Sequence, residues 1–389
     1  MLAASNTGAV LLVAALSAGC TFYACPSNHC GEDAPASGGS SQGGANGQSG
    51  GGGQAGSEGP EPTGSWVPVT GSLVDLESEC GNMAYLSSKP DEDLLIAGVA
   101  QNGLWASSDG GDTWTRLGTG RKSATIINRT SSILYDPDDA NTFWETGIYN
   151  GDGLYVTHDA GKTFSSLGIT HNDYVSIDFG DPDRKTIIAS GHEADHLLHL
   201  SQDGGESWQD ISKNEPDGVG ACSFPYVLDD KTFLLGCRSY SGSSGIYRST
   251  NAGTSWKSVS SNGGAAAPLL AADGSLYFAS DVNTGLTRSQ DEGRTWSDLG
   301  AVGVVDWGVA PIQLPDGRLA SVATRHVVIS ADDGKSWRIV STDIGNNPTG
   351  IVYSQYRKAF YVWRLTCDDT SEHIPEDGIL RYDFDYESE

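Results

Sequence analysis

One eight-residue pattern recurs six times along the chain and constrains its fold more than any other feature. The pattern is Ser/Thr-x-Asp/Asn-x-Gly-x-Ser/Thr-Trp/Phe, and its copies occupy residues 107–114, 157–164, 201–208, 249–256, 289–296 and 330–337. Consecutive copies begin 40 to 50 residues apart, which is the usual length of one four-stranded blade of a β-propeller. The spacing therefore predicts an all-β propeller with one repeat in each of six blades.

Each repeat has the composition of a tight hairpin turn. Its third residue can accept backbone N–H bonds, its glycine can adopt left-handed backbone angles, and its final aromatic residue can pack between blades. We expect a structural role for the third residues, which are Asp109, Asp159, Asp203, Asn251, Asp291 and Asp332. Calcium binding is the alternative, but one carboxylate in each blade cannot supply the roughly six oxygen ligands that Ca²⁺ requires.

Segments at the two ends of the domain predict a seventh blade. Three strand-like segments follow the sixth repeat, at residues 350–353, 359–363 and 378–383, and the chain then stops. Residues 64–70, around Trp66, look like the strand that follows each repeat but have no repeat before them. We expect this N-terminal strand to complete the last blade of a seven-bladed β-propeller, because closure removes the exposed edges of an open ring.

The six repeats resemble the Asp-box, or bacterial neuraminidase repeat, of proteins that include sialidases, sortilin-type receptors, oligoxyloglucan hydrolases and photosystem II assembly factors. The resemblance covers residues 65–389 and implies the fold, but these proteins share the turn and not the chemistry. Sialidases place a substrate-binding arginine before the first Asp-box, whereas no arginine precedes Arg116 here. Residues 99–103 also lack the catalytic aspartate that the oligoxyloglucan hydrolases have at that place.

The first 64 residues indicate export and a flexible attachment. An apolar run at residues 9–16, too short to cross a bilayer, leads into Leu16-Ser17-Ala18-Gly19-Cys20, which looks like a bacterial lipobox with Cys20 as the lipidated residue. The departure from this pattern is that no Lys or Arg precedes the run. We expect a signal peptide at residues 1–20, a Gly/Ser-rich tether at 21–64 and the propeller at 65–389, anchored in the bacterial cell envelope.

Four of the seven cysteines predict two disulfides, because the chain looks exported. In the expected topology Cys80 and Cys367 fall on the same face of adjacent blades, where a bond would join the first blade to the last. Cys222 and Cys237 flank a hairpin with an expected two-residue turn at Asp229-Asp230, and that register places them directly opposite each other. A buried free thiol is the alternative for each pair.

The charge of the chain limits its partners. A formal net charge of −27 argues against nucleic acid and against docking to anionic lipid, because both are polyanions that bind basic patches. Membrane association is therefore expected only through the lipid anchor. No part of the sequence looks like a cofactor-binding fold, so no cofactor or metal is expected, and we expect a monomer.

A ligand site is expected on the propeller face opposite the repeat turns, where the blade connections and the loops between second and third strands meet. Polar and aromatic side chains suited to sugar binding occur in these loops, and the candidate ligand-binding residues are His171, Asp173, Tyr174, His192, Glu193, Asp306, Trp307 and Arg325. The same loops contain Arg121, Lys122, Arg129, Asp195, His196, Arg238, Tyr240 and His326. A solvated polar rim without a ligand is the alternative.

One string in these loops matches a metalloprotease motif. His192-Glu193-Ala194-Asp195-His196 has the required residue types, but the motif binds zinc only when a helix puts both histidines on one side. The flanking segments are strand-like, so we interpret the match as a coincidence.

Two functions from different classes remain open. The first, favoured because the catalytic residues of the enzymatic relatives are missing, is a surface lipoprotein that binds a polysaccharide or a cell-surface protein without turning it over. The second is an extracellular glycan-degrading enzyme, either a hydrolase or a lyase. Such an enzyme would use rim carboxylates, or histidine together with tyrosine.

Overall fold

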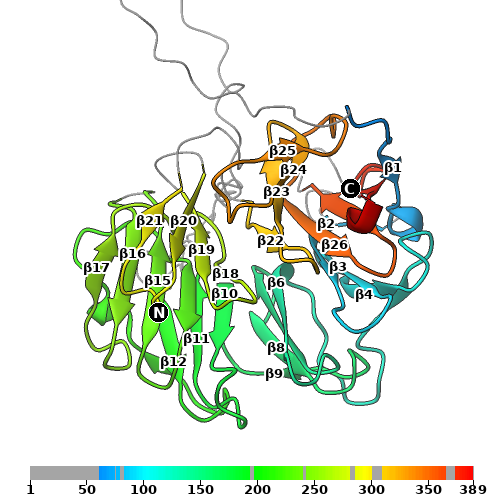
Figure 1. Cartoon of the computed structure of the whole chain (residues 1–389). Helices are drawn as coiled ribbons and strands as arrows, with labels where there is room; N and C mark the ends of the chain where they lie inside the picture. The colour runs from blue at the N-terminus through cyan, green and yellow to red at the C-terminus, as the bar shows by residue number, and fades with distance from the viewer. Residues whose placement is uncertain are drawn as a thin grey trace, which may run out of the picture.

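The computed structural model describes residues 61–74, 76–78, 83–192, 197–239, 242–280, 285–299, 309–364 and 373–388. Cys20, the expected signal peptide and most of the expected tether lie outside these residues. The strands form seven four-stranded sheets, and these are arranged around a common centre, with β6, β10, β18 and β22 near the centre and β9, β17 and β25 toward the outside (Figure 1). The fold is a seven-bladed β-propeller, as the repeat spacing predicted.

The first three blades follow one another along the chain. Blade 1 contains β2 (Met83–Ser88), β3 (Leu95–Val99), β4 (Gly103–Ser107) and β5 (Thr115–Arg116). Blade 2 contains β6 (Arg129–Tyr135), β7 (Phe143–Ile148), β8 (Leu154–Thr157) and β9 (Ser165–Ser166). Blade 3 contains β10 (Asn172–Ile177), β11 (Ile187–Gly191), β12 (Leu198–Ser201) and β13 (Gln209–Asp210).

Blades 4 to 6 repeat this order. Blade 4 contains β14 (Phe224–Val227), β15 (Phe233–Cys237), β16 (Gly245–Ser249) and β17 (Lys257–Ser260). Blade 5 contains β18 (Leu269–Leu270), β19 (Leu276–Ala279), β20 (Leu286–Ser289) and β21 (Ser297–Asp298). Blade 6 contains β22 (Ile312–Gln313), β23 (Leu319–Ala323), β24 (His326–Ser330) and β25 (Arg338–Ile339).

Blade 7 is built from both ends of the domain. It contains β26 (Gly350–Ser354), β27 (Ala359–Trp363) and β28 (Ile379–Asp383), and its fourth strand is β1 (Val67–Pro68). Strand β1 pairs antiparallel with β28, with Val67 opposite Arg381. Beside this pair, the Trp66 Nε1–H donates to the Thr342 carbonyl at 2.9 Å. Three short 3₁₀ helices complete the described elements: Gly71–Leu73, Ser212–Asn214 and Tyr386–Ser388.

The six repeats form the turns between the third and fourth strands of blades 1 to 6. In the first, the Thr113 N–H donates to Asp109 Oδ1 at 2.9 Å and the Thr113 hydroxyl donates to Oδ2. These bonds from Thr113 hold the pKa of Asp109 well below its usual range. The bonds recur at Asp159, Asp203, Asp291 and Asp332.

The asparagine in the fourth repeat keeps the same turn without a charge. Asn251 Oδ1 accepts from the Ser255 N–H at 3.0 Å, and its Nδ2 donates to the Ser255 hydroxyl at 2.9 Å. The hydroxyl reverses its role from donor to acceptor, so the geometry is preserved. The carboxylates of the other repeats are therefore hydrogen-bonded within their own turns and have a structural role.

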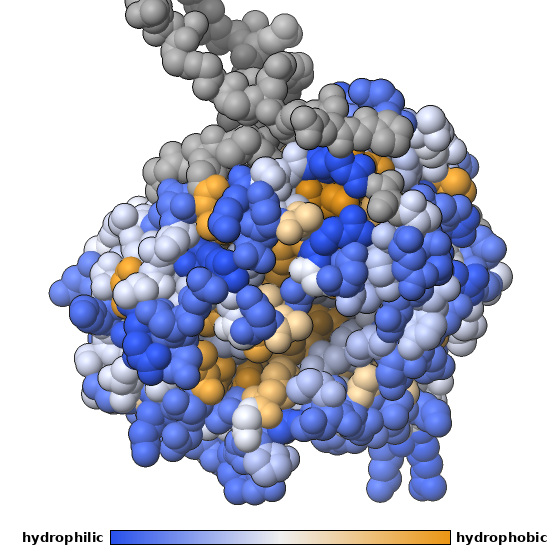
Figure 2. Space-filling model, in the orientation of Figure 1, coloured by the Kyte–Doolittle hydropathy of each residue, from blue (hydrophilic) through white to orange (hydrophobic). Residues whose placement is uncertain are grey.

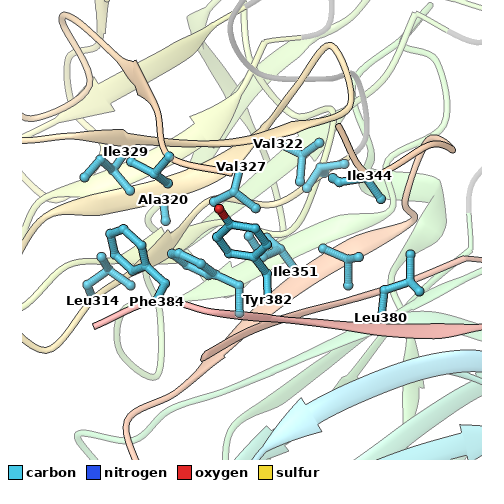
Figure 3. Packing of buried hydrophobic residues seen from close by; sticks show 14 residues of the cluster. Leu314, Ala320, Val322, Val327, Ile329, Ile344, Ile351, Leu380, Tyr382 and Phe384 are labelled. Atoms are coloured by element: carbon cyan, nitrogen blue, oxygen red, sulfur yellow. The ribbon is translucent and has the colours of Figure 1, made fainter. Parts of the chain in front are cut away.

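The apolar core lies between neighbouring blades. In the interface of blades 6 and 7, Val322, Val327 and Ile329 face Ile351 and Tyr382 (Figure 3). The last residue of a repeat often joins such an interface: Trp114 packs between blades 7 and 1, and Phe164 between blades 1 and 2. Burying these side chains stabilises the contact between sheets by roughly 1.5–3 kcal/mol each.

One predicted disulfide is confirmed, although its register is not the expected one. Cys222 and Cys237 are bonded, but Phe224 lies opposite Gly236 and Val227 opposite Phe233, so the two cysteines are offset by one position. The expected two-residue turn is wrong, because Asp229 Oδ1 accepts from the N–H groups of the two residues that follow Asp230 and makes the loop longer. Cys80 and Cys367 lie outside the described residues, and their pairing stays a prediction.

Candidate functional site

Irregular pairing in the innermost strands of blades 2 and 3 shapes the site. The pairing of β6 with β7 skips Ser131, and the pairing of β10 with β11 skips Asp173. Such bulges bend a strand and redirect the side chain of the extra residue. Both bulge residues line the same pocket at the centre of the propeller.

Asp173 begins a hydrogen-bonded chain that crosses from blade 3 to blade 2. Its Oδ1 lies 2.6 Å from His192 Nδ1, directly after β11. His192 Nε2 lies 3.1 Å from the hydroxyl of Tyr149, directly after β7. If Asp173 is ionised, it accepts the Nδ1 proton and leaves Nε2 as the acceptor for the phenol. We call Asp173, His192 and Tyr149 the relay.

Exposure differs along the relay. The side chain of His192 is 2% exposed and that of Asp173 is 18% exposed, while Tyr149 is half-buried. The imidazole is thus held between two groups that solvent can reach. A buried imidazole with a carboxylate on one nitrogen and a phenol on the other can move a proton to or from the phenol.

Neighbouring rings fix the position of Tyr149. The ring of His171 stacks on that of His192 with centroids 5.9 Å apart, and both imidazoles meet the Tyr149 ring edge-on. The Arg129 guanidinium lies 4.8 Å from the Tyr149 ring centroid. Tyr149 and His171 have positive φ angles of 57° and 61°, a costly conformation for residues other than glycine that often occurs at functional sites.

The relay borders a pocket of about 260 Å³ at the centre of the propeller, and Figure 2 shows a hollow with hydrophobic side chains in the middle of the molecule. Its described lining contains residues from all seven blades. The polar lining includes Ser131, Asp173, His192 and Arg238, and the aromatic lining is Tyr85, Tyr174, Phe224 and Trp363. Hydrogen-bonding groups beside aromatic faces are the combination that holds a sugar ring.

The confirmed disulfide supports one wall of this pocket. Cys222 precedes Phe224 and Cys237 precedes Arg238, and the Arg238 guanidinium lies 4.8 Å from the Phe224 ring centroid. The bond therefore holds together the two segments that carry this pair. Phe224 in turn meets the Tyr174 ring edge-on, with centroids 6.0 Å apart.

Replacing both Cys222 and Cys237 by serine is expected to lower the free energy of unfolding. The cystine closes a loop with a sequence separation of 15, for which the loss of loop-closure entropy in the unfolded chain is worth about 3 kcal/mol. Denaturant titration of the oxidised protein and the double variant measures this difference. Indistinguishable midpoints would show that the bond contributes nothing to the fold.

A buried acid lies in blade 2, outside the pocket. Glu145 in β7 has no exposed surface, and burial raises its pKa to about 8, against the opposing effect of hydrogen bonds from Thr130 and Asn128. The Asn128 side-chain N–H donates to Glu145 Oε2 at 3.3 Å, while Glu145 Oε1 and Asn128 Oδ1 have no hydrogen-bond partner among the described residues. Glu145 is therefore a protonated acid at neutral pH rather than a charged site residue.

The predicted ligand residues fall into three groups. His171, Asp173, Tyr174 and His192 come together at the relay and the pocket. Arg325 occupies the loop between β23 and β24, pairs with Asp343 at 2.7 Å and lies apart from the described pocket lining. Glu193, Asp306 and Trp307 lie outside the described residues. The strand-like segments that flank Glu193 are β11 and β12.

Tyr149 was missed as a specific residue. The available signal is its place directly after the second strand of blade 2, because Tyr149-Asn150-Gly151 lies in a loop between second and third strands, where ligand residues are expected. Within the described residues, no three His, Cys, Asp or Glu side chains gather as a metal site. The same part of the chain contains no helix with the length and apolarity to span a bilayer.

Comparisons with known proteins agree with this architecture. A family model described as sortilin, neurotensin receptor 3, matches residues 102–243. A probable oligoxyloglucan-reducing end-specific xyloglucanase of Neosartorya fischeri is 28% identical over 222 residues, covering 49% of this chain and 26% of that protein. Sortilin of Rattus norvegicus is 24% identical over 151 residues, covering 38% of this chain and 17% of its own length.

The match to this chain thus spans only about a quarter of the length of the xyloglucanase and a smaller share of the length of sortilin. Among solved structures, a GH74 xyloglucanase from Xanthomonas campestris is similar with a TM-score of 0.54 and 17% identity, over 83% of this chain and 56% of that one. At this identity the likeness shows the fold alone. The chain is thus a seven-bladed β-propeller that is similar over part of its length to sortilin and to the xyloglucanase.

Proposed function

We propose that this chain is an exported glycan-degrading enzyme whose polysaccharide substrate binds in the central pocket. The observation that carries the proposal is the relay, in which Asp173 and Tyr149 are joined through the buried His192 at the edge of that pocket. A sugar-binding protein needs aromatic faces and hydrogen bonds, but it does not need a buried imidazole aligned between a carboxylate and a phenol. The xyloglucanase relative supports the same class of function.

The sequence supports a location outside the cytoplasm. The lipobox-like Cys20 and the Gly/Ser-rich tether support a lipid-anchored propeller in the bacterial cell envelope. The confirmed disulfide supports an oxidising compartment. A polysaccharide is a substrate that such a protein meets outside the cell.

The second function, binding without turnover, also has an observation in its favour. Tyr85 and Trp363 meet edge-on at 5.2 Å in the pocket wall, and Tyr174 and Phe224 form another aromatic pair there. Such pairs would hold a pyranose whether or not a bond is broken. This function predicts saturable binding of a polysaccharide without new reducing ends.

Replacing His192 by glutamine is expected to lower the rate of polysaccharide cleavage about 10²–10⁴-fold, the usual contribution of a general acid or base. The measurement is the release of reducing ends from a panel of neutral and acidic polysaccharides. His158→Gln is the matched control, because His158 lies in the second repeat turn, on the opposite face.

The control is expected to retain wild-type activity and both variants to keep the wild-type melting temperature. Equal activity of His192→Gln and the wild type would contradict the proposed role of the relay. Binding of a polysaccharide with no turnover by the wild type would favour the second function instead.

A further inference from the structure

The described lining of the central pocket is divided into a polar half and an apolar half. We propose that the sugar unit held there carries a methyl-terminated substituent, either the methyl group of a 6-deoxy sugar or an acetyl group, and that this substituent lies against the apolar half. This inference rests on the proposed function and deepens it, because it names the class of sugar that the pocket selects. It depends on which blades supply each half and on how short the apolar side chains are.

The polar half comes from blades 2 to 4. Blade 2 contributes Ser131 and Ser132, blade 3 contributes Asp173 and His192, and Ser223 directly precedes the first strand of blade 4. These side chains line the pocket with hydroxyl, carboxylate and imidazole groups, which are the groups that bond to sugar hydroxyls. A sugar that turns most of its hydroxyl groups toward blades 2 to 4 therefore keeps them among polar atoms.

The apolar half comes from blades 5 to 7, which complete the ring on the other side of the pocket (Figure 1). Its described lining includes Ala266 and Ala267 before β18, Ala310 and Pro311 before β22, and Ile351 in β26. Among the described lining residues of this half, the hydroxyl of Thr349 and the indole of Trp363 supply the polar side-chain atoms. The two halves of the pocket thus differ strongly in polarity.

The backbone around residues 263–267 fixes the position of the alanines in blade 5. Gly264 has a φ of 84°, and a Cβ atom on it would lie 2.6 Å from the backbone nitrogen of Cys237, so this close approach to β15 requires glycine. The next residue, Ala265, donates its N–H to the Ala279 carbonyl at 3.2 Å. Contacts with blades 4 and 5 therefore hold the segment that carries the alanines to the pocket.

Short side chains leave room for a ligand group in the apolar half. Ala267 and Ala310 are partly exposed, and each side chain ends at its Cβ atom. A sugar hydroxyl placed against these alanines would give up hydrogen bonds to water and meet mainly carbon atoms. A methyl group in the same place gives up no hydrogen bond and gains apolar burial. This wall therefore selects a sugar in which a methyl-terminated group takes the place of a hydroxyl or hydroxymethyl group.

The test measures binding of matched pairs of free sugars to the wild-type protein. L-rhamnose with L-mannose and L-fucose with L-galactose are pairs that differ by a methyl or hydroxymethyl group at C5, and N-acetyl-D-glucosamine with D-glucose is a pair that differs by an acetamido or hydroxyl group at C2. Titration followed by NMR gives the dissociation constants, and saturation transfer shows which sugar protons lie against the protein. In at least one pair the methyl-bearing sugar is expected to bind roughly 10–100-fold more tightly, with the strongest transfer to its methyl protons.

Variants of the alanine wall locate the methyl group. Ala267→Leu fills the space beside the wall and is expected to remove the preference within that pair. Ala272→Leu is the matched control, because Ala272 is exposed in the turn between β18 and β19 and is not part of the described pocket lining; it is expected to keep the preference. Both variants should keep the wild-type circular-dichroism melting curve. If Ala267→Leu melts early, Ala267→Ser takes its place, because it adds a hydroxyl with little volume and should also weaken the preference.

The possible results separate this inference from the proposed function. Equal affinities within every pair, or tighter binding of the hydroxylated sugars, would overturn the inference and leave a glycan-degrading enzyme in place. A preference that survives in folded Ala267→Leu would also overturn it, since the methyl group would then lie elsewhere. If none of these sugars binds, the inference fails as well, and the polysaccharide panel measured with His192→Gln decides the proposed function separately. The pair that shows the preference distinguishes a 6-deoxy sugar from an acetylated one.

Discussion

Deleting residues 64–70 is expected to lower the melting temperature sharply, whereas deleting residues 21–60 is expected to leave it unchanged. The first deletion removes β1 from the edge of β28. It also removes Trp66, whose ring centroid lies 5.1 Å from that of Tyr382, and the buried Val69. Blade 7 would then have three strands and an unpaired edge at the junction with blade 6.

Hydrogen bonds add to this loss. The Thr70 hydroxyl donates to the Glu376 carbonyl at 2.7 Å and accepts from the Ile379 N–H at 3.0 Å. With the lost apolar burial, the cost in free energy of unfolding is roughly 5 kcal/mol, which is a large part of the margin of about 5–15 kcal/mol of an ordinary domain. Thermal unfolding of the two truncations gives the comparison, and equal stability would show that β1 is dispensable.

Glu145→Gln is expected to stabilise the protein increasingly as the pH rises from about 4.5 toward 8. Burial raises the pKa of Glu145 from 4.5 to about 8. Within this window the unfolded chain loses the Glu145 proton while the folded chain keeps it. The wild type therefore loses stability as the pH rises, by about 1.4 kcal/mol per pH unit from this residue.

A neutral glutamine removes this penalty, and below about pH 4.5 the difference in stability between the two proteins should no longer change with pH, since Glu145 is then protonated in both states. Denaturant midpoints of wild type and variant at several pH values measure the effect. Glu206→Gln is the control, because Glu206 is an exposed acid in the third repeat turn. If the stability of Glu145→Gln ran parallel to that of the wild type at all pH values, Glu145 would not be the buried acid described here.

The repeats made the architecture predictable because their signal is local. Asp109 forms its bonds within its own turn, so the turn can be read from eight consecutive residues, and the interval between turns sets the size of a blade. The strand before the first repeat, Gly103–Ser107, was also read correctly for the same reason. The hairpin between Cys222 and Cys237 was less predictable, because Asp229 extends its loop and a shift of one residue changes every pair.

The relay could be predicted only in part. Polar residues in the rim loops indicated His171, Asp173 and His192, but their mutual contact depends on the bulge at Asp173 and on how blade 2 meets blade 3. Tyr149 contacts His192 although the two residues are 43 positions apart in sequence. No local sequence pattern indicates a contact between residues so far apart. The burial of Glu145 could not be predicted, because a single acidic residue within a strand does not indicate whether its side chain is buried or exposed.

The most direct test of the account is the position of a bound oligosaccharide. A crystal structure of the His192→Gln variant with an oligosaccharide of the polymer that the wild type cleaves would locate the ligand while turnover is slow. The account predicts that the ligand lies in the central pocket against Tyr174 and Phe224, with its scissile bond beside residue 192. A ligand bound to the repeat turns on the opposite face, with the central pocket empty, would contradict it.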